Sequence, residues 1–127
     1  LYPFGYGLSY TTFRFSDITL NRSSIGMDNE LVASVTVTNT GDRAGSEVVQ
    51  LYIRDLVGSV TRPVKELKGF EKIYLQPNES RTVRFTIAPE MLKFYNADLK
   101  FVAEPGDFDV MIGPDSRNVK TARFTLR

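Results

Sequence analysis

Alternation of apolar and polar side chains along short runs is the feature that most constrains this fold. In residues 31–38 the odd positions are leucine, alanine and two valines, and the even positions are valine, serine and two threonines. Residues 82–87 repeat the pattern with Val83, Phe85 and Ile87 at the apolar positions. Successive side chains of a β-strand point to opposite faces, so this period of two predicts sheets with one buried face.

Turn residues and irregularities separate these runs. Asn39-Thr40-Gly41-Asp42 is typical of a turn, and so is Gln76-Pro77-Asn78-Glu79, in which proline fixes φ and asparagine tolerates a positive φ. A phase change near Asp17 indicates a bulge or a bend in the first run. Gly69 indicates a second bulge or a close backbone approach. Residues 89–95 predict one short helical turn that begins at a proline.

The number and spacing of the runs predict the fold class. Further strands are expected at residues 13–20, 47–54, 67–75, 99–103, 108–112 and 119–126. Short strands of this spacing predict an all-β fold, a two-sheet antiparallel sandwich of seven to eight strands that is immunoglobulin- or fibronectin type III-like. A closed β-barrel is the alternative. With 127 residues, 42% of them hydrophobic, the chain suits one domain with one core and is not disordered.

The charges argue against two classes of partner. Sixteen basic side chains face fifteen acidic ones, and the two signs are interspersed along the sequence. Because no region has a strong field of one sign, we expect neither nucleic acid nor an anionic membrane as a partner. No apolar run approaches the ~18 residues that a membrane-spanning helix requires.

The chain contains no histidine and no cysteine. Histidine is the commonest metal ligand and the only side chain whose unperturbed pKa lies near neutrality. Its absence, together with that of cysteine, excludes Ser/His/Asp and Cys/His catalysis and the usual zinc sites. We therefore expect no catalytic residue, no cofactor and no metal in this chain.

The first ten residues fit neither a helical nor a strand period, because glycine and proline separate their aromatic side chains. We expect residues 1–12 to be a linker from a preceding domain, since an apolar linker needs a surface on which to pack. Candidate interdomain contacts in it are Tyr2, Phe4, Tyr6 and Tyr10. The alternative is an N-terminal strand that folds over its own sandwich.

The long connection from Asp55 to Lys65 is a second candidate contact region, because long loops between sandwich strands often reach a partner. Our hypothesis is that Val57 and Arg62 contact the neighbouring domains, with Arg62 as an ionic anchor. The alternative is a solvated surface loop.

Several stretches of the sequence together resemble one family. They lie in order along nearly the whole chain, and they are Pro3-Phe4-Gly5-Tyr6-Gly7-Leu8-Ser9-Tyr10-Thr11-Thr12-Phe13, Val35-Thr36-Val37-Thr38-Asn39-Thr40-Gly41, Val49-Gln50-Leu51-Tyr52, Arg62-Pro63-Val64-Lys65-Glu66-Leu67-Lys68-Gly69-Phe70-Glu71-Lys72, Leu92-Lys93-Phe94-Tyr95-Asn96 and Glu104-Pro105-Gly106-Asp107-Phe108. This series resembles the C-terminal fibronectin type III-like domain of glycoside hydrolase family 3. Related sequences often carry Trp in place of Phe101 and Gly in place of Asn78.

The resemblance implies a role for the chain. Members of that family cleave β-linked glucosides, xylosides or related glycosides with retention, and their catalytic aspartate and glutamate lie in earlier domains. Residues 13–127 would then be a non-catalytic accessory sandwich that stabilises the catalytic domains in cis and docks on them. The parent would be a β-glucosidase acting on terminal β-D-glucosyl residues, or a β-xylosidase, in the periplasm or outside the cell.

Acid pairs and tyrosines offer alternative sites. Asp107 with Asp109, and Glu66 with Glu71, are nominal carboxylate pairs, but acids two apart on a strand are expected on a solvated outer face. An all-oxygen calcium site would need more ligands than Asp107 and Asp109 supply. A tyrosine platform that stacks on sugars would make the chain an independent carbohydrate-binding or adhesion module, with weak glycan contact. Its members would be Tyr52, Tyr74 and Tyr95.

Overall fold

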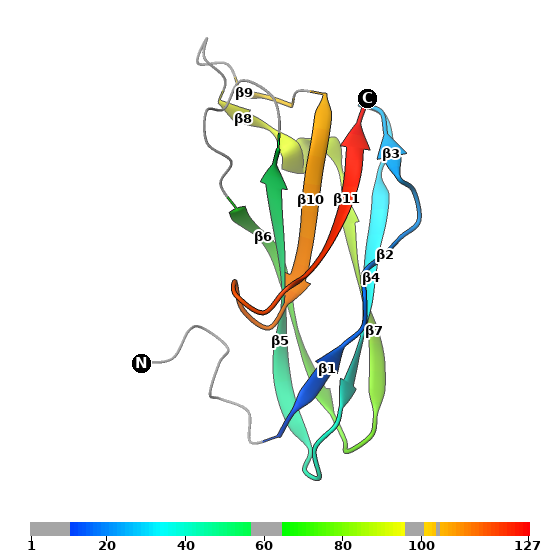
Figure 1. Ribbon diagram of the computed structural model, residues 1–127, viewed down its shortest axis with the longest axis vertical. Helices are drawn as coiled ribbons and strands as arrows, with labels where there is room; N and C mark the ends of the chain where they lie inside the picture. Colours follow the sequence, from blue (N-terminus) through cyan, green and yellow to red (C-terminus); the bar gives the residue numbers. More distant parts are fainter. Residues whose placement is uncertain (1–10, 57–64, 96–100, 104) are drawn as a thin grey trace.

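Two β-sheets face each other along the length of the molecule (Figure 1). The computed structural model describes residues 11–56, 65–95, 101–103 and 105–127. The first sheet contains β1 (Phe13–Phe15), β2 (Thr19–Leu20), β4 (Leu31–Asn39) and β7 (Ser80–Ile87). The second has the order β3 (Ser24–Ile25), β11 (Lys120–Leu126), β10 (Gly106–Gly113), β5 (Gly45–Asp55) and β6 (Lys65–Leu75). A small third sheet pairs β8 (Phe94–Tyr95) with β9 (Phe101–Val102), after the 3-10 helix η1 (Pro89–Leu92). The predicted two-sheet sandwich is confirmed.

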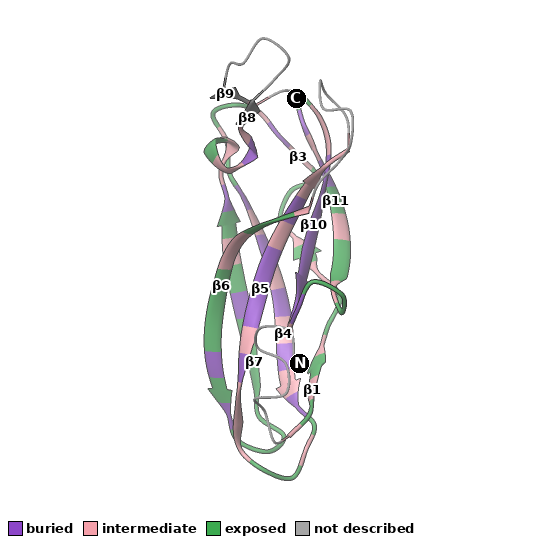
Figure 2. Cartoon of the chain, turned by 90° about the vertical axis from the view of Figure 1, so that its left-hand side faces the viewer, coloured by how far each residue is buried: buried purple, intermediate pink, exposed green. Residues whose placement is uncertain are grey.

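The core lies between the inner faces of the two sheets, as the buried stripes of Figure 2 show. In β4 every second residue is buried, as the alternation predicts. Phe108 of β10 stacks on Phe124 of β11, with 5.4 Å between the ring centroids. Burial of each such side chain contributes about 1.5–3 kcal/mol, so the sandwich is stabilised mainly by this layer. Its completely buried members include Ile25, Leu31, Val37, Val49, Leu75, Ile87, Val110 and Ile112.

The first predicted strand divides into two short strands on the same edge of β4. Phe15 pairs with Val37, but Thr19 pairs with Ser34, so one extra residue lies between the two pairs. Ser16 fills the gap, because its N–H donates to Thr36 O and its Oγ accepts from Thr36 N. The phase change expected near Asp17 is therefore a bulge.

β3 departs from the antiparallel expectation, because it pairs with β11 in parallel through Thr125 opposite Ser24 and Leu126 opposite Ile25. The chain between β2 and β3 crosses from one sheet to the other, and the crossing reverses the direction of pairing. Two residues are too few to define a period, so the direction of this strand could not be predicted from the sequence.

Both predicted irregularities near β6 are present. In the turn after β6, Asn78 has a φ of 64°, and Glu79 N donates to Gln76 O at 3.0 Å. Within β6, Leu51 of β5 pairs with Gly69 while Tyr52 pairs with Leu67. Lys68 is therefore the extra residue of a bulge.

The buried side chain of Asn39 lies at one end of the sandwich and connects several segments there by hydrogen bonds. Its Nδ2 donates to Arg43 O at 2.8 Å and to Leu75 O at 3.1 Å. Its Oδ1 accepts from Gly41 N at 3.0 Å and from Thr11 Oγ1 at 2.9 Å. The amide thus joins the entering chain, the β4–β5 turn and the end of β6, with every hydrogen-bonding position of its NH₂ group used.

Candidate docking surface

The six contact residues expected from the sequence lie outside the described residues. They are Tyr2, Phe4, Tyr6, Tyr10, Val57 and Arg62. The two flanks of residues 57–64 are described. Leu56 N donates to Asp107 O at 3.0 Å, and Arg54 pairs with Lys65 across β5 and β6. The residues that flank the connection therefore lie on adjacent strands of the five-stranded sheet.

A buried carboxylate occupies the middle of that outer face. Asp109 of β10 is 3% exposed, with Arg54 Nη2 at 2.9 Å from its Oδ2 and Arg123 Nε at 3.2 Å from its Oδ1. The expectation that Asp109 is a solvated acid is wrong, because β5 and β11 each place an arginine beside it. Asp107 lies two residues earlier in β10, and its Oδ1 accepts a hydrogen bond from Thr125 Oγ1 at 2.8 Å. Each carboxylate oxygen of Asp109 faces one guanidinium group, so the buried charge is paired within the sheet.

A second polar cluster lies over β5. The hydroxyl of Tyr52 donates to Gln50 Oε1, and Lys65 Nζ lies 5.7 Å from the centre of the Tyr52 ring. The same ammonium group donates to Ser116 O at 2.6 Å, so it connects β6 with the β10–β11 loop. Burial, and then the charge of Asp115, raise the pKa of Tyr52. Tyr52 is therefore a neutral donor under ordinary conditions.

Two carboxyl groups near this loop have shifted pKa values in opposite directions. Burial raises the pKa of Asp115, but hydrogen bonds from Asn118 and Arg117 outweigh it and hold the pKa below its usual value. Burial of Glu47 raises its pKa from 4.5 to about 7, opposed by a hydrogen bond from Val48 N and assisted by the charge of Asp115. Of these two carboxyl groups, Glu47 is therefore the one whose charge changes near neutrality.

Glu47→Gln is expected to remove a pH dependence of stability between about pH 5 and 7. The folded state holds the proton of Glu47 more tightly than the unfolded chain, in which the pKa of this carboxyl group is 4.5. The contribution is therefore complete below pH 4.5 and is lost as the pH rises through about 7. The free energy of unfolding should fall by about 1–3 kcal/mol across this window, and the substitution should abolish that fall.

Urea unfolding at several pH values checks this prediction. Glu71→Gln, on the exposed part of β6, is the matched control and should keep the profile of the unchanged chain. Equal pH slopes in Glu47→Gln and the unchanged chain would contradict the assignment.

Three large apolar side chains project from the outer face of β6. Leu67, Phe70 and Tyr74 are 51%, 66% and 55% exposed, and together they form the β6 strip. Among the described residues no strand pairs with the far edge of β6. Exposed apolar surface on an edge strand favours aggregation unless a partner covers it. No sequence pattern indicated the β6 strip, although Gly69 indicated an irregularity at the point where Leu67 turns outward.

The proposed tyrosine platform is not assembled by Tyr52 and Tyr74. Tyr52 pairs with Leu67 at one end of the β5–β6 ladder, and Tyr74 pairs with Ser46 at the other. The side chain of Tyr95 lies outside the described residues. Successive residues of a strand are about 3.3 Å apart, so Tyr52 and Tyr74 are too distant for one sugar ring to touch both.

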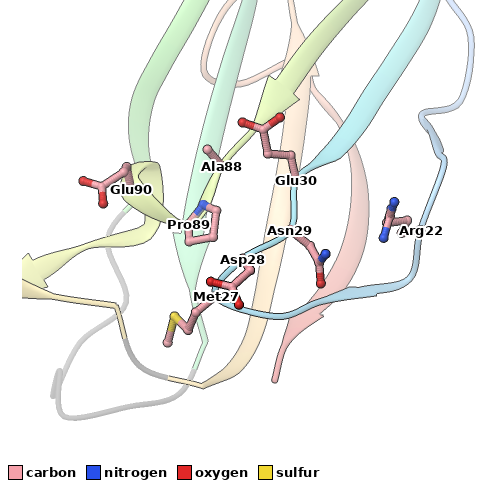
Figure 3. A pocket seen from close by; sticks show the side chains of 8 residues that line it. All are labelled: Arg22, Met27, Asp28, Asn29, Glu30, Ala88, Pro89 and Glu90. Carbon is pink, nitrogen blue, oxygen red and sulfur yellow. The ribbon is translucent and has the colours of Figure 1, made fainter.

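An open groove of about 500 Å³ lies between the β3–β4 connection and η1 (Figure 3), at the end of the sandwich opposite to Asn39. Its acids, Asp28, Glu30 and Glu90, are all exposed, and Glu90 forms an ion pair with Lys93 at 3.0 Å. An exposed carboxylate lacks the desolvation that keeps a general acid protonated. The remaining lining residues are Arg22, Met27, Asn29, Ala88 and Pro89.

The described residues contain no cluster of three or more acidic side chains that could hold a metal ion. Glu66 and Glu71, the other nominal acid pair, are both exposed on β6. No helix in the described part of the chain has the length and apolar character needed to cross a membrane. Of the four large hydrophobic side chains that are exposed among the described residues, three lie on the outer face of β6.

Comparison with known proteins agrees with the sandwich. Residues 47–116 match the family model described as a fibronectin type III-like domain. The chain belongs to the fibronectin type III-like domain family. This fibronectin type III-like domain is 56% identical over 126 residues to the periplasmic β-glucosidase of Salmonella typhimurium. It is 54% identical over 127 residues to a putative β-xylosidase of Formosa agariphila.

The same domain occurs in solved structures. A β-glucosidase of Erythrobacter marinus superimposes with a TM-score of 0.90 at 50% identity, over 99% of this chain and 17% of that chain. The matches to the Salmonella and Formosa relatives cover 99% and 100% of this chain, but only 16% and 17% of theirs. The fibronectin type III-like domain therefore spans about one sixth of the proteins it matches. The resemblance to the domain of family 3 glycoside hydrolases is confirmed.

Proposed function

We propose that this domain is a non-catalytic accessory domain of a family 3 glycoside hydrolase, one that stabilises the catalytic domains and docks on them in cis. The single observation that carries the proposal is coverage. Almost the whole chain matches β-glucosidases and β-xylosidases, yet it spans about one sixth of their length. The parent would be a retaining β-glucosidase acting on terminal β-D-glucosyl residues, or a β-xylosidase. Location in the periplasm or outside the cell is proposed from the periplasmic Salmonella relative.

The proposed division of the chain is a linker over residues 1–12 and a sandwich over residues 13–127. Contacts by Tyr2, Phe4, Tyr6, Tyr10, Val57 and Arg62 remain part of the proposal. The β6 strip supports docking of the sheet itself, because it leaves three large apolar side chains uncovered by the described residues. Its proposed occupant is the catalytic part of the parent chain.

Phe70→Ser in the parent enzyme tests this docking. If the catalytic domains cover Phe70, the substitution should weaken the interface by about 1–2 kcal/mol and lower the temperature at which the enzyme loses glycosidase activity. In the 127-residue chain alone the same substitution should change stability by no more than about 0.5 kcal/mol, because Phe70 is 66% exposed there. Thermal inactivation and urea unfolding measure the two effects.

Met27→Ser is the matched control, since Met27 is 48% exposed and follows β3, the strand at the opposite edge of the five-stranded sheet from β6. It should leave the inactivation temperature of the parent unchanged. Identical inactivation of Phe70→Ser, Met27→Ser and the unchanged enzyme would remove docking through β6. Saturable binding of β-glucans by the 127-residue chain would instead favour the independent carbohydrate-binding module.

A further inference from the structure

The side chain of Thr11 packs closely against the end of β4 and the β4–β5 turn. Its Oγ1 donates to the buried Asn39 Oδ1 at 2.9 Å. The next residue is held as well, because Thr12 O accepts from Thr40 N at 2.8 Å and the hydroxyls of Thr12 and Thr40 lie 2.8 Å apart. β1 begins one residue later, with Phe13 opposite Asn39. From Thr11 to the end of β1, hydrogen bonds and strand pairing therefore hold the chain against β4 or the turn that follows it.

Two glycines make room for the Thr11 side chain. A Cβ on Gly41 would overlap Thr11 Oγ1 and would lie 3.1 Å from Thr12 N. A Cβ on Gly45 would lie 2.8 Å from Thr11 Cγ2. Neither glycine is among the described residues with positive φ, so the turn itself does not require glycine at these positions. The close approach of Thr11 is the physical reason that side chains are excluded there.

We infer that Thr11, Thr12, Asn39, Gly41 and Gly45 form an anchor, here named the Thr11 anchor, that fixes the direction in which the polypeptide leaves the sandwich at residue 11. The linker would then hold the sandwich and the preceding domain in one fixed relative orientation. A flexible tether would need a freely rotating residue at this point. One hydrogen bond of the Thr11 side chain, two hydrogen bonds of Thr12 and the close approach of Thr11 to two glycines restrict that rotation.

The inference rests on the proposed function only for the role of residues 1–12 as a linker, of which Thr11 and Thr12 are the part held by the anchor. The anchor itself can be measured on the 127-residue chain. Because the sequence has no cysteine, two introduced cysteines can be labelled with nitroxides without side reactions. Suitable positions are Tyr10→Cys, next to the anchor, and Arg84→Cys, on the exposed face of β7.

Pulsed electron spin resonance then reports the distribution of distances between the two labels. We expect one narrow distribution in the labelled chain and a broadening of about twofold or more in Thr11→Ala and Gly41→Ala. Gly69→Ala is the matched control, since its added Cβ would meet only side-chain atoms, at 3.7 Å or beyond, and its distribution should stay narrow.

Each outcome decides the question. If Gly41→Ala does not fold, Thr11→Ala still tests the anchor, because it removes Oγ1 and Cγ2 without an overlap and without the extra backbone freedom of glycine. A distribution in the labelled chain that is as broad as in Thr11→Ala would overturn the inference, and so would a narrow distribution in Thr11→Ala. The proposed function is tested separately by glycosidase assays on the parent, so an inactive parent would leave a measured anchor standing.

Discussion

Asn39→Leu is expected to destabilise the chain by about 3–5 kcal/mol. Leucine has a similar volume, so the loss comes from hydrogen bonds. Four bonds of the Asn39 side chain disappear, each of which contributes about 1 kcal/mol. The carbonyl of the buried Leu75 is among the groups that lose a donor.

The long range of these bonds explains why the effect should be large. Asn39 bonds to Thr11, 28 residues earlier, and to Leu75, 36 residues later. Its loss would release the chain entry and the end of β6 together. Urea unfolding of the 127-residue chain measures the free energy of unfolding.

Asn21→Leu is the control for this prediction. The exposed Asn21 accepts one bond, from Val32 N at 2.7 Å, so its substitution should cost about 1 kcal/mol or less. A loss below about 1 kcal/mol in Asn39→Leu would show that the network contributes little.

Gly113→Ala is expected to destabilise the chain by about 2–4 kcal/mol. An added Cβ would overlap the carbonyl oxygen of Asn118 and lie 2.9 Å from the Cα of Val119. Both atoms belong to the backbone, so no side-chain rotation relieves the overlap. The β10–β11 loop resists a shift because Asp115 Oδ1 accepts from Arg117 N at 2.8 Å and Asn118 N at 3.0 Å.

Thermal or urea unfolding compares Gly113→Ala with Gly69→Ala. The Cβ of the control would meet Phe85 at 3.7 Å and Leu51 at 3.8 Å, which are ordinary contacts. We expect the control to change stability by no more than about 1 kcal/mol in either direction. Equal stabilities of the two alanine variants would show that the loop moves freely. Displacement of the loop would also separate Lys65 from Ser116, at the outer face of the sheet.

The outer face shows how one irregularity limits a sequence-based prediction. Counting by twos from the buried Ile73 places Leu67 on the inner face, yet Leu67 is 51% exposed. The extra residue Lys68 shifts the phase, so every residue before it in β6 changes face. Gly69 predicted an irregularity, but only the register with β5 shows on which side the extra residue lies.

Asp109 shows a second limit. Its neighbours in sequence give it the pattern of an outward-facing acid, and it does project from the outer face. Its burial comes from Arg54 and Arg123, which lie 55 and 14 residues away in sequence. No local pattern connects these three residues, because strand pairing alone brings them together.

Local sequence patterns were sufficient to predict the all-β class, the two-layer sandwich, irregularities near Asp17 and Gly69 and the turn at Asn78. The order of the quoted stretches was sufficient to show the resemblance to the family. Each of these depends on local period, local backbone preference or residue order. The parallel pairing of β3, the burial of Asp109 and Glu47, the β6 strip and the Thr11 anchor became visible only in the folded chain. Each of these depends on which distant strands become neighbours and in what register. Register is set by packing of the whole core, and a single inserted residue changes it for everything on one side.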